Sequence, residues 1–83
     1  MKGFALTEHA ADMMRQRGIP VKWIEQAIKA PDKTEVRERE GTKHYIRAIK
    51  ERGGRYLRVV VSKETDPARI ITMFFDRRLG RMP

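Results

Sequence analysis

Four side chains in two neighbouring segments of the chain have the types needed to bind a polyanion. Tyr45 and Arg47 stand two residues apart in one expected strand, and Tyr56 and Arg58 stand two apart in the next. Because alternate residues of a strand point to the same face, each Tyr–Arg pair shares one face of the sheet. Arginine binds phosphate through a fork of N–H donors, and tyrosine rings stack on unpaired bases. This combination is typical of surfaces that bind single-stranded RNA.

The pairing of the two strands determines whether these side chains meet. If the strands pair across a loop at residues 51–54, Arg47 lies opposite Arg58 and all four side chains share one face. A tighter turn at Gly53–Gly54 shifts the register but leaves the four side chains on one face. An odd-length loop or a bulge would place the two Tyr–Arg pairs on opposite faces. Two opposed arginines repel each other unless an anion lies between them. We therefore predict an anion-binding face on the sheet.

Cleavage of RNA without a metal needs a base, an acid and cations for the developing phosphorane charge. Histidine titrates near neutral pH, so His9 and His44 are the candidate acid and base, and Arg58 is the candidate charge stabiliser. His9 lies at the expected start of a helix, where packing or capping is the alternative role. His44 points to the face opposite Tyr45 if its strand is regular, toward the core or the rim.

Two further residues complete the candidate RNA-binding set. Arg17 ends the first expected helix, on the same side as His9. Thr72 is a polar residue in an apolar strand, where it either satisfies a neighbour's hydrogen bond or lines the site. The alternative for the four Tyr and Arg side chains of the sheet is that they lie over an exposed face, with Glu38 or Glu51 as their salt partners.

The composition indicates a folded, cationic chain. Of its 83 residues, 40% are hydrophobic and 36% are charged, and 19 Lys+Arg against 11 Asp+Glu give a net charge of +8. Such a field attracts phosphate backbones, although a solubilising surface or an acidic protein partner is the alternative. The chain has no cysteine and two histidines, so we expect neither disulfides, a metal site nor another cofactor. Since no apolar run approaches about 18 residues and no signal-peptide pattern occurs, we expect a cytoplasmic protein without membrane partners.

The elements that position these residues follow from caps and periodicity. Thr7 is a suitable N-cap and Gly18 a suitable stop for one helix, and Pro20 opens a second that Pro31 ends. After Pro31 the apolar pattern changes from helical to alternating. Short connections favour an antiparallel four-stranded meander with both helices on one face, an α+β fold. We predict one domain over 1–83, with helices over about 7–17 and 20–30, strands over about 34–39, 43–50, 55–62 and 69–75, and a basic tail over 76–83.

Short blocks spread over nearly the whole chain carry a family resemblance. They are Leu6–Ala10, Met14–Ile19, Ala30–Asp32, Arg55–Val61 and Ile70–Phe74. Together they resemble a family of small uncharacterised bacterial proteins that is classified as a domain of unknown function, number forty-two fifty-eight. That family looks similar to the RelE-type toxins and the wider barnase/RelE-like ribonuclease fold, with two N-terminal helices against a four-stranded sheet.

The resemblance implies a metal-independent endoribonuclease of toxin type that acts on RNA or the ribosome, with the uncovered sheet face as its cleft. It also implies an acidic antitoxin-like protein as a second partner. Carried over by position, it marks His9, Arg17, Arg58 and Thr72, but the chain lacks the C-terminal Tyr or His usual in RelE-type toxins. The competing expectation is a non-catalytic module that binds RNA, the ribosome or an acidic protein.

Overall fold

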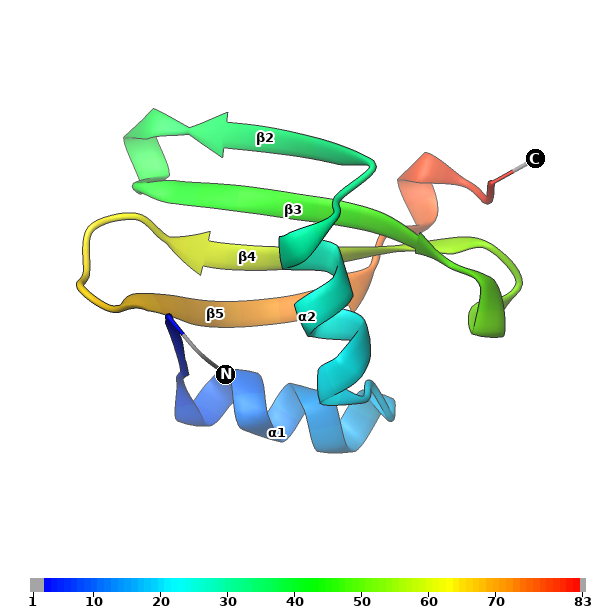
Figure 1. The fold of residues 1–83 in the computed structure, drawn as a ribbon, viewed down its shortest axis with the longest axis horizontal. Coiled ribbons are helices and arrows are strands. Elements are labelled where there is room, and N and C mark those ends of the chain that lie inside the picture. The colour runs from blue at the N-terminus through cyan, green and yellow to red at the C-terminus, as the bar shows by residue number, and fades with distance from the viewer. Residues whose placement is uncertain (1–2, 83) are drawn as a thin grey trace.

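A computed structural model describes residues 3–82, so Met1, Lys2 and Pro83, which the predicted domain and tail include, lie outside the described residues. The elements are β1 (Phe4–Leu6), α1 (Glu8–Arg17), α2 (Val21–Lys29), β2 (Lys33–Arg37), β3 (Thr42–Ile49), β4 (Arg55–Ser62) and β5 (Ala68–Phe75). In Figure 1, α2 crosses one face of a five-stranded sheet and α1 runs alongside β5, and both helices pack against the same hydrophobic core. Single 3-10 turns occupy Glu38–Glu40, Lys50–Arg52 and Arg77–Leu79.

The caps expected from the sequence delimit α1. The Thr7 hydroxyl accepts a hydrogen bond from the backbone N–H of Ala10 at 3.0 Å, and Gly18 ends the helix in the left-handed conformation at φ 61°. The same hydroxyl donates to the carbonyl of Ile70, which fixes the start of α1 to β5. Neither helix within residues 3–82 is long and apolar enough to cross a membrane.

The sheet has the order β1-β5-β4-β3-β2. Four strands, β2 to β5, form the expected antiparallel meander, and β1 adds a parallel edge by pairing Phe4–Leu6 with Ala68–Ile70. The α+β class with two helices is confirmed, but the sheet is five-stranded and mixed rather than four-stranded and antiparallel. A three-residue strand is too short to show an alternating pattern, which is why the sequence did not reveal β1.

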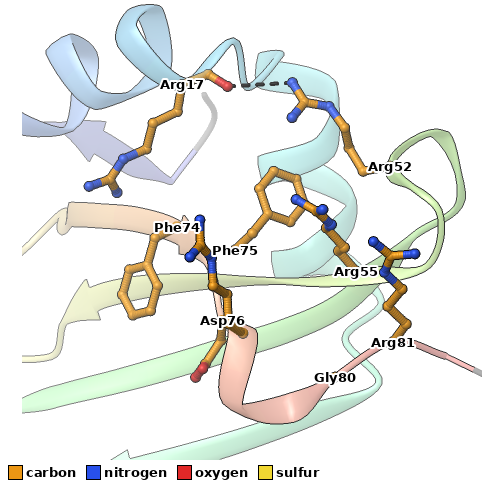
Figure 2. A pocket seen from close by; sticks show the side chains of 9 residues that line it. Arg17, Arg52, Arg55, Phe74, Phe75, Asp76, Gly80 and Arg81 are labelled. Atoms are coloured by element: carbon orange, nitrogen blue, oxygen red, sulfur yellow. Dashed lines mark hydrogen bonds between the residues drawn. The ribbon is translucent and has the colours of Figure 1, made fainter.

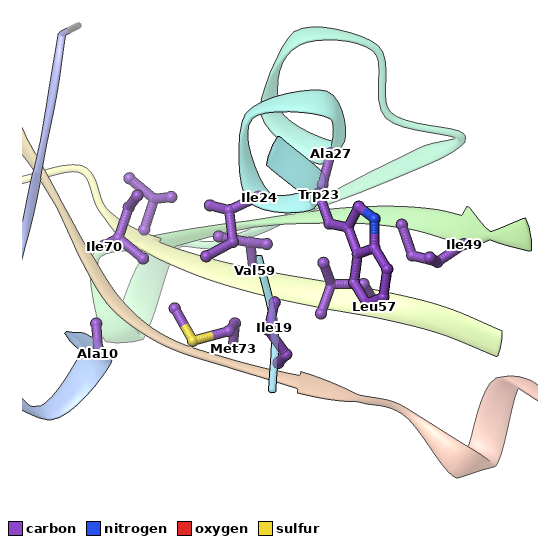
Figure 3. Close-up of a cluster of buried hydrophobic side chains, with 11 residues drawn as sticks. Ala10, Ile19, Trp23, Ile24, Ala27, Ile49, Leu57, Val59, Ile70 and Met73 are labelled. Atoms are coloured by element: carbon purple, nitrogen blue, oxygen red, sulfur yellow. The ribbon is translucent and has the colours of Figure 1, made fainter. Parts of the chain in front are cut away.

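The hydrophobic core lies between the helices and one face of the sheet, here called the helix face (Figure 3). Trp23 covers one end of this core, with its ring edge-on to Phe75 at 6.4 Å. Burial of these apolar side chains is the main stabilising contribution in a domain of this size. The buried members are Ala10, Ile19, Trp23, Ile24 and Ala27 from the helical layer, and Ile49, Leu57, Val59, Val61, Ile70 and Met73 from the sheet.

The connection between β3 and β4 has an odd number of residues, which sets a different register from the expected one. Residues Lys50–Gly54 form this loop, and its two closing glycines both have positive φ. Arg47 consequently pairs with Leu57, and Arg58 pairs with Ile46. The prediction that Arg47 lies opposite Arg58 is wrong by one residue, because a one-residue slip turns one strand's side chains to the other face.

The chain after β5 forms a strap, residues Asp76–Met82, across the other face of the sheet, here called the open face. Backbone hydrogen bonds join its first residue to Tyr56 and its last to Gly54. Between these bonds, Leu79 lines a hollow with Ile46 and Tyr56. The segment expected as a basic tail is therefore, over its described part, attached to the sheet.

Candidate functional site

The Tyr/Arg face predicted from the sequence is divided between the two sides of the sheet. Tyr45 and Arg47 lie on the helix face, whereas Tyr56 and Arg58 lie on the open face. Tyr45 packs against the core, and the Arg47 guanidinium donates a hydrogen bond to the carbonyl of Ala30 after α2. Both side chains of β3 therefore attach the strand to the helical layer.

Arg58 is the centre of a buried polar network on the open face, with only 3% of its surface exposed. Its Nε donates to Oδ2 of Asp76 at 2.9 Å, and its Nη1 donates to Oε2 of Glu35 at 2.7 Å. The same Nη1 lies 2.9 Å from Nδ1 of His44. A buried guanidinium needs such partners, because an unpaired charge in the interior costs several kcal/mol.

The contact with Arg58 fixes the tautomer of His44. A guanidinium only donates hydrogen bonds, so Nδ1 of His44 accepts and the ring proton resides on Nε2. That Nε2 is buried and has no hydrogen-bond partner among residues 3–82. Burial, followed by the charges of Arg37 and Arg58, lowers the pKa of His44. The ring is accordingly neutral at pH 7, since a histidine of ordinary pKa is already mostly neutral there.

The carboxylates of the network are held in their ionised form. Hydrogen bonds from the side chain and backbone of Arg78, and from the side chain of Arg58, lower the pKa of Asp76 from 3.8 to about 2 despite its burial. A hydrogen bond from Arg58 also lowers the pKa of Glu35. Both groups therefore remain charged at neutral pH and balance the cations beside them.

The other predicted residues fall in separate places. His9 is exposed on the first turn of α1, on the helix side of the sheet, so it does not join Arg58 and His44. Thr72 lies half-buried on the open face opposite Val60. The structure thus brings together two of the three candidate catalytic residues and leaves His9 apart.

A second cluster, here called the arginine cleft, lies where β5 ends and the strap begins. It has a volume of about 610 Å³. Figure 2 shows Arg17 from the end of α1, Arg52 from the β3–β4 loop and Arg81 from the strap around the rings of Phe74 and Phe75. The lining residues are Arg17, Arg52, Arg55, Phe74, Phe75, Asp76, Arg77, Gly80 and Arg81.

Two of the five cleft arginines are fixed by contacts with neutral groups. Arg17 donates from Nη1 to the carbonyl of Met73 at 2.6 Å. Met73 lies in the part of β5 that does not pair with β1. Arg52 donates to the carbonyl of Gly18 at 3.0 Å, and its guanidinium lies 5.3 Å from the ring centres of both Trp23 and Phe75. These contacts orient the two side chains without neutralising their charge.

A pair of opposed arginines that the sequence did not predict lies at the cleft. Arg55 at the start of β4 and Arg81 in the strap are partners in an antiparallel bridge. Like charges placed directly opposite each other on a sheet are destabilising. Arg55, Arg77 and Arg81 are exposed, and within residues 3–82 none of them forms an ion pair. The cleft therefore carries uncompensated positive charge.

The lining of the cleft consists mainly of guanidinium donors and aromatic rings. Its one acidic lining residue, Asp76, is 4% exposed and is bound by Arg58 and Arg78. Arginine stays protonated at all relevant pH values, so the lining offers donors and rings but no group that exchanges protons near pH 7. Among residues 3–82, no group of three His, Asp or Glu side chains is placed to hold a metal ion.

Sequence reasoning found Arg17 but missed Arg52, Arg55, Phe74, Arg77 and Arg81. A signal for them existed in the sequence. Arg52 lies in the β3–β4 loop and Arg55 begins β4, whereas Arg77 and Arg81 follow the end of the adjacent antiparallel strand β5. The end of β5 must lie beside the start of β4 in such a pair. The two basic segments could therefore have been placed together.

The fold and the cleft define a small, basic α+β domain with an arginine-lined cleft at one end of its sheet. The chain belongs to the family described as Domain of unknown function (DUF4258), whose model matches residues 6–75. The family indicated by the sequence blocks is thereby confirmed. The match ends at the last residue of β5, so Arg77 and Arg81 lie outside it. Searches of curated proteins and of solved structures gave no match to this chain.

Proposed function

We propose that this protein binds RNA through the arginine cleft. The main support is the convergence of five guanidiniums on one cleft beside an aromatic ring, that of Phe74. Guanidiniums form paired hydrogen bonds with phosphate oxygens, and a ring offers a stacking surface for an unpaired base. The net charge of +8 would steer a polyanion toward the molecule. Ribosomal RNA belongs to this ligand class, so docking on the ribosome is one form of the proposal.

An acidic protein, such as an antitoxin-like partner, is the other polyanion that fits the charge of the cleft. It would use the guanidiniums but has no base to stack on Phe74. RNA uses both features, which is why the observations favour it.

The proposal is tested by titrating a fluorescent single-stranded RNA with the wild-type protein at several salt concentrations. The logarithm of the affinity should fall with the logarithm of salt, with a slope of about −0.7 for each phosphate contacted. A slope of about −2 is expected if Arg55, Arg77 and Arg81 each contact a phosphate. Polyglutamate serves as an acidic competitor without bases. A slope near zero would contradict binding of RNA phosphates by the cleft. Displacement of the RNA by an equal charge concentration of polyglutamate would contradict the preference for RNA over an acidic protein.

A second candidate function, a metal-independent endoribonuclease of RelE/barnase-like type, has its own support. Glu35, His44 and Arg58 meet on the sheet face opposite the helices. In such a centre, the Glu35 carboxylate would take the proton of the 2′-hydroxyl and Arg58 would stabilise the phosphorane. The neutral His44 would donate a hydrogen bond from Nε2–H to the leaving 5′-oxygen, and water would supply the proton that this oxygen takes up. Asp76, the first residue of the strap, already occupies Nε of Arg58, so binding of a phosphate by Arg58 would require this ion pair to open.

The two functions are separated by the fate of the RNA in the same titration, performed with EDTA. Binding alone leaves the RNA at full length. Cleavage shortens it, and His44→Ala should abolish the shortening while the exposed His9→Ala variant retains it. A toxin-type enzyme would also arrest the growth of its host on expression. Intact RNA after prolonged incubation with excess protein would count against the endoribonuclease.

A further inference from the structure

The arginine cleft concentrates more charge than a segment of nucleic-acid backbone supplies. Five guanidiniums line about 610 Å³, and the one carboxylate in the lining is already bound by two other arginines. Each phosphodiester of an RNA strand carries one negative charge, and a ribose separates it from the next. A strand crossing so small a space would leave several of the cations unmatched.

An oligophosphate group matches this charge density. Its phosphorus atoms are joined through single bridging oxygens, so several negative charges occupy the volume of a few atoms. We propose that the cleft binds a terminal oligophosphate, either the 5′-triphosphate end of an RNA or the triphosphate of a free nucleotide. This inference rests on the proposed function for the location of the ligand and names the chemical group that the cleft selects.

The placement of the cleft arginines supports this ligand. Arg55 and Arg81 pair in an antiparallel bridge, so their charged side chains extend from neighbouring backbone segments. Arg77 also lines the cleft. All three are exposed and available to donate. Like charges on adjacent strands repel each other. A multivalent anion between the two guanidiniums accepts hydrogen bonds from both, and its negative charge offsets their repulsion. A single phosphodiester has too few unesterified oxygens to engage all three guanidiniums in pairs.

The size and the aromatic wall of the cleft fit a nucleotide end. A volume of about 610 Å³ lies within the range of sites that enclose a small molecule. Phe75 is already covered by the Arg52 guanidinium, whereas Phe74 is half-buried and has no such cover among the described residues. The Phe74 ring is therefore the surface on which the base next to the oligophosphate would stack.

The test compares four probes on the wild-type protein in the presence of EDTA: tripolyphosphate, ATP, and one RNA oligonucleotide with either a 5′-triphosphate or a 5′-hydroxyl end. The triphosphate RNA should bind at least about tenfold more tightly than the hydroxyl RNA, which corresponds to one additional charge-assisted contact. Tripolyphosphate should displace it. If ATP binds as tightly as the triphosphate RNA, the source of the group is a free nucleotide. If the RNA binds more tightly, the source is an RNA end.

A matched pair of variants ties the preference to the cleft. Arg55→Gln/Arg81→Gln removes the opposed charges, and Arg39→Gln/Arg69→Gln removes two exposed charges that do not line the cleft. The first variant should lose the preference for the triphosphate end and the second should keep it, with circular dichroism confirming that both are folded. Equal affinity of the wild type for the two RNA ends would overturn this inference but not RNA binding. Failure of both RNAs to bind would overturn the proposed function as well.

Discussion

Reversing the charges of Arg55 and Arg81 to glutamate is expected to lower the affinity for single-stranded RNA by a factor on the order of 100. Hydrogen bonds to charged groups contribute about 1.5–3 kcal/mol each, so the loss of two is at least a hundredfold effect. The two arginines face each other across a strand bridge and have no carboxylate partner within residues 3–82. The measurement is fluorescence anisotropy of labelled RNA at one fixed salt concentration.

The control for this prediction is Arg39→Glu/Arg69→Glu, which changes the net charge by the same amount at exposed positions outside the cleft. General electrostatic attraction would weaken equally in the two double variants, because it depends on the total charge. We expect the control to lose much less affinity than the cleft variant. Equal losses would show that RNA is held by overall charge rather than by the arginine cleft.

The largest loss of stability is expected from Asp76→Asn. Asp76 is 4% exposed and Arg58 is 3% exposed, so the substitution leaves a buried guanidinium with one ionic partner fewer. Removing one member of a buried ion pair costs about 3–5 kcal/mol, against a total stability of about 5–15 kcal/mol for a small domain. Urea unfolding followed by the fluorescence of the single tryptophan, Trp23, measures the loss. Asp12→Asn, at an exposed ion pair with Arg15, should cost less than about 1 kcal/mol.

The same carboxylate gives the stability a defined dependence on pH. Its folded-state pKa of about 2 lies below the ordinary value of 3.8, so the folded protein binds fewer protons than the unfolded chain in this interval. The stabilisation from Asp76 is fully present above about pH 4 and is lost as the pH falls toward 2. The wild type should therefore lose stability over this window more steeply than Asp76→Asn. Parallel acid profiles of the two proteins would contradict the assigned network.

The local features of the fold followed from the sequence. Thr7 and Gly18 marked the ends of α1 because capping depends on residues within one turn of the helix. The alternation of apolar residues located β3, β4 and β5 to within one residue at each end. The faces of β4 followed from its alternation, but the faces of β3 did not. They depend on the length of the Lys50–Gly54 loop, because one additional residue turns the side chains of β3 to the other face.

The arginine cleft depends on a contact between distant parts of the chain. The strap reaches the sheet because Asp76 binds the buried Arg58 and because Met82 donates a backbone hydrogen bond to Gly54 at 2.8 Å. The strap has no apolar periodicity that would indicate these contacts. Its arginines therefore led to the prediction of a basic tail. The sequence could supply the types of residue that bind a phosphate, but the pairing of Arg55 with Arg81 required the three-dimensional structure.

The most direct test of the cleft as the RNA-binding site is an NMR titration that follows the Nε–Hε signals of the arginine side chains as single-stranded RNA is added. A guanidinium that engages a phosphate changes the environment of this N–H, so each arginine reports its own contact. We predict large shifts for Arg55, Arg77 and Arg81 and small shifts for Arg47, which lies on the helix face. Large shifts at Arg47, with the signals of the cleft arginines unchanged, would contradict the account.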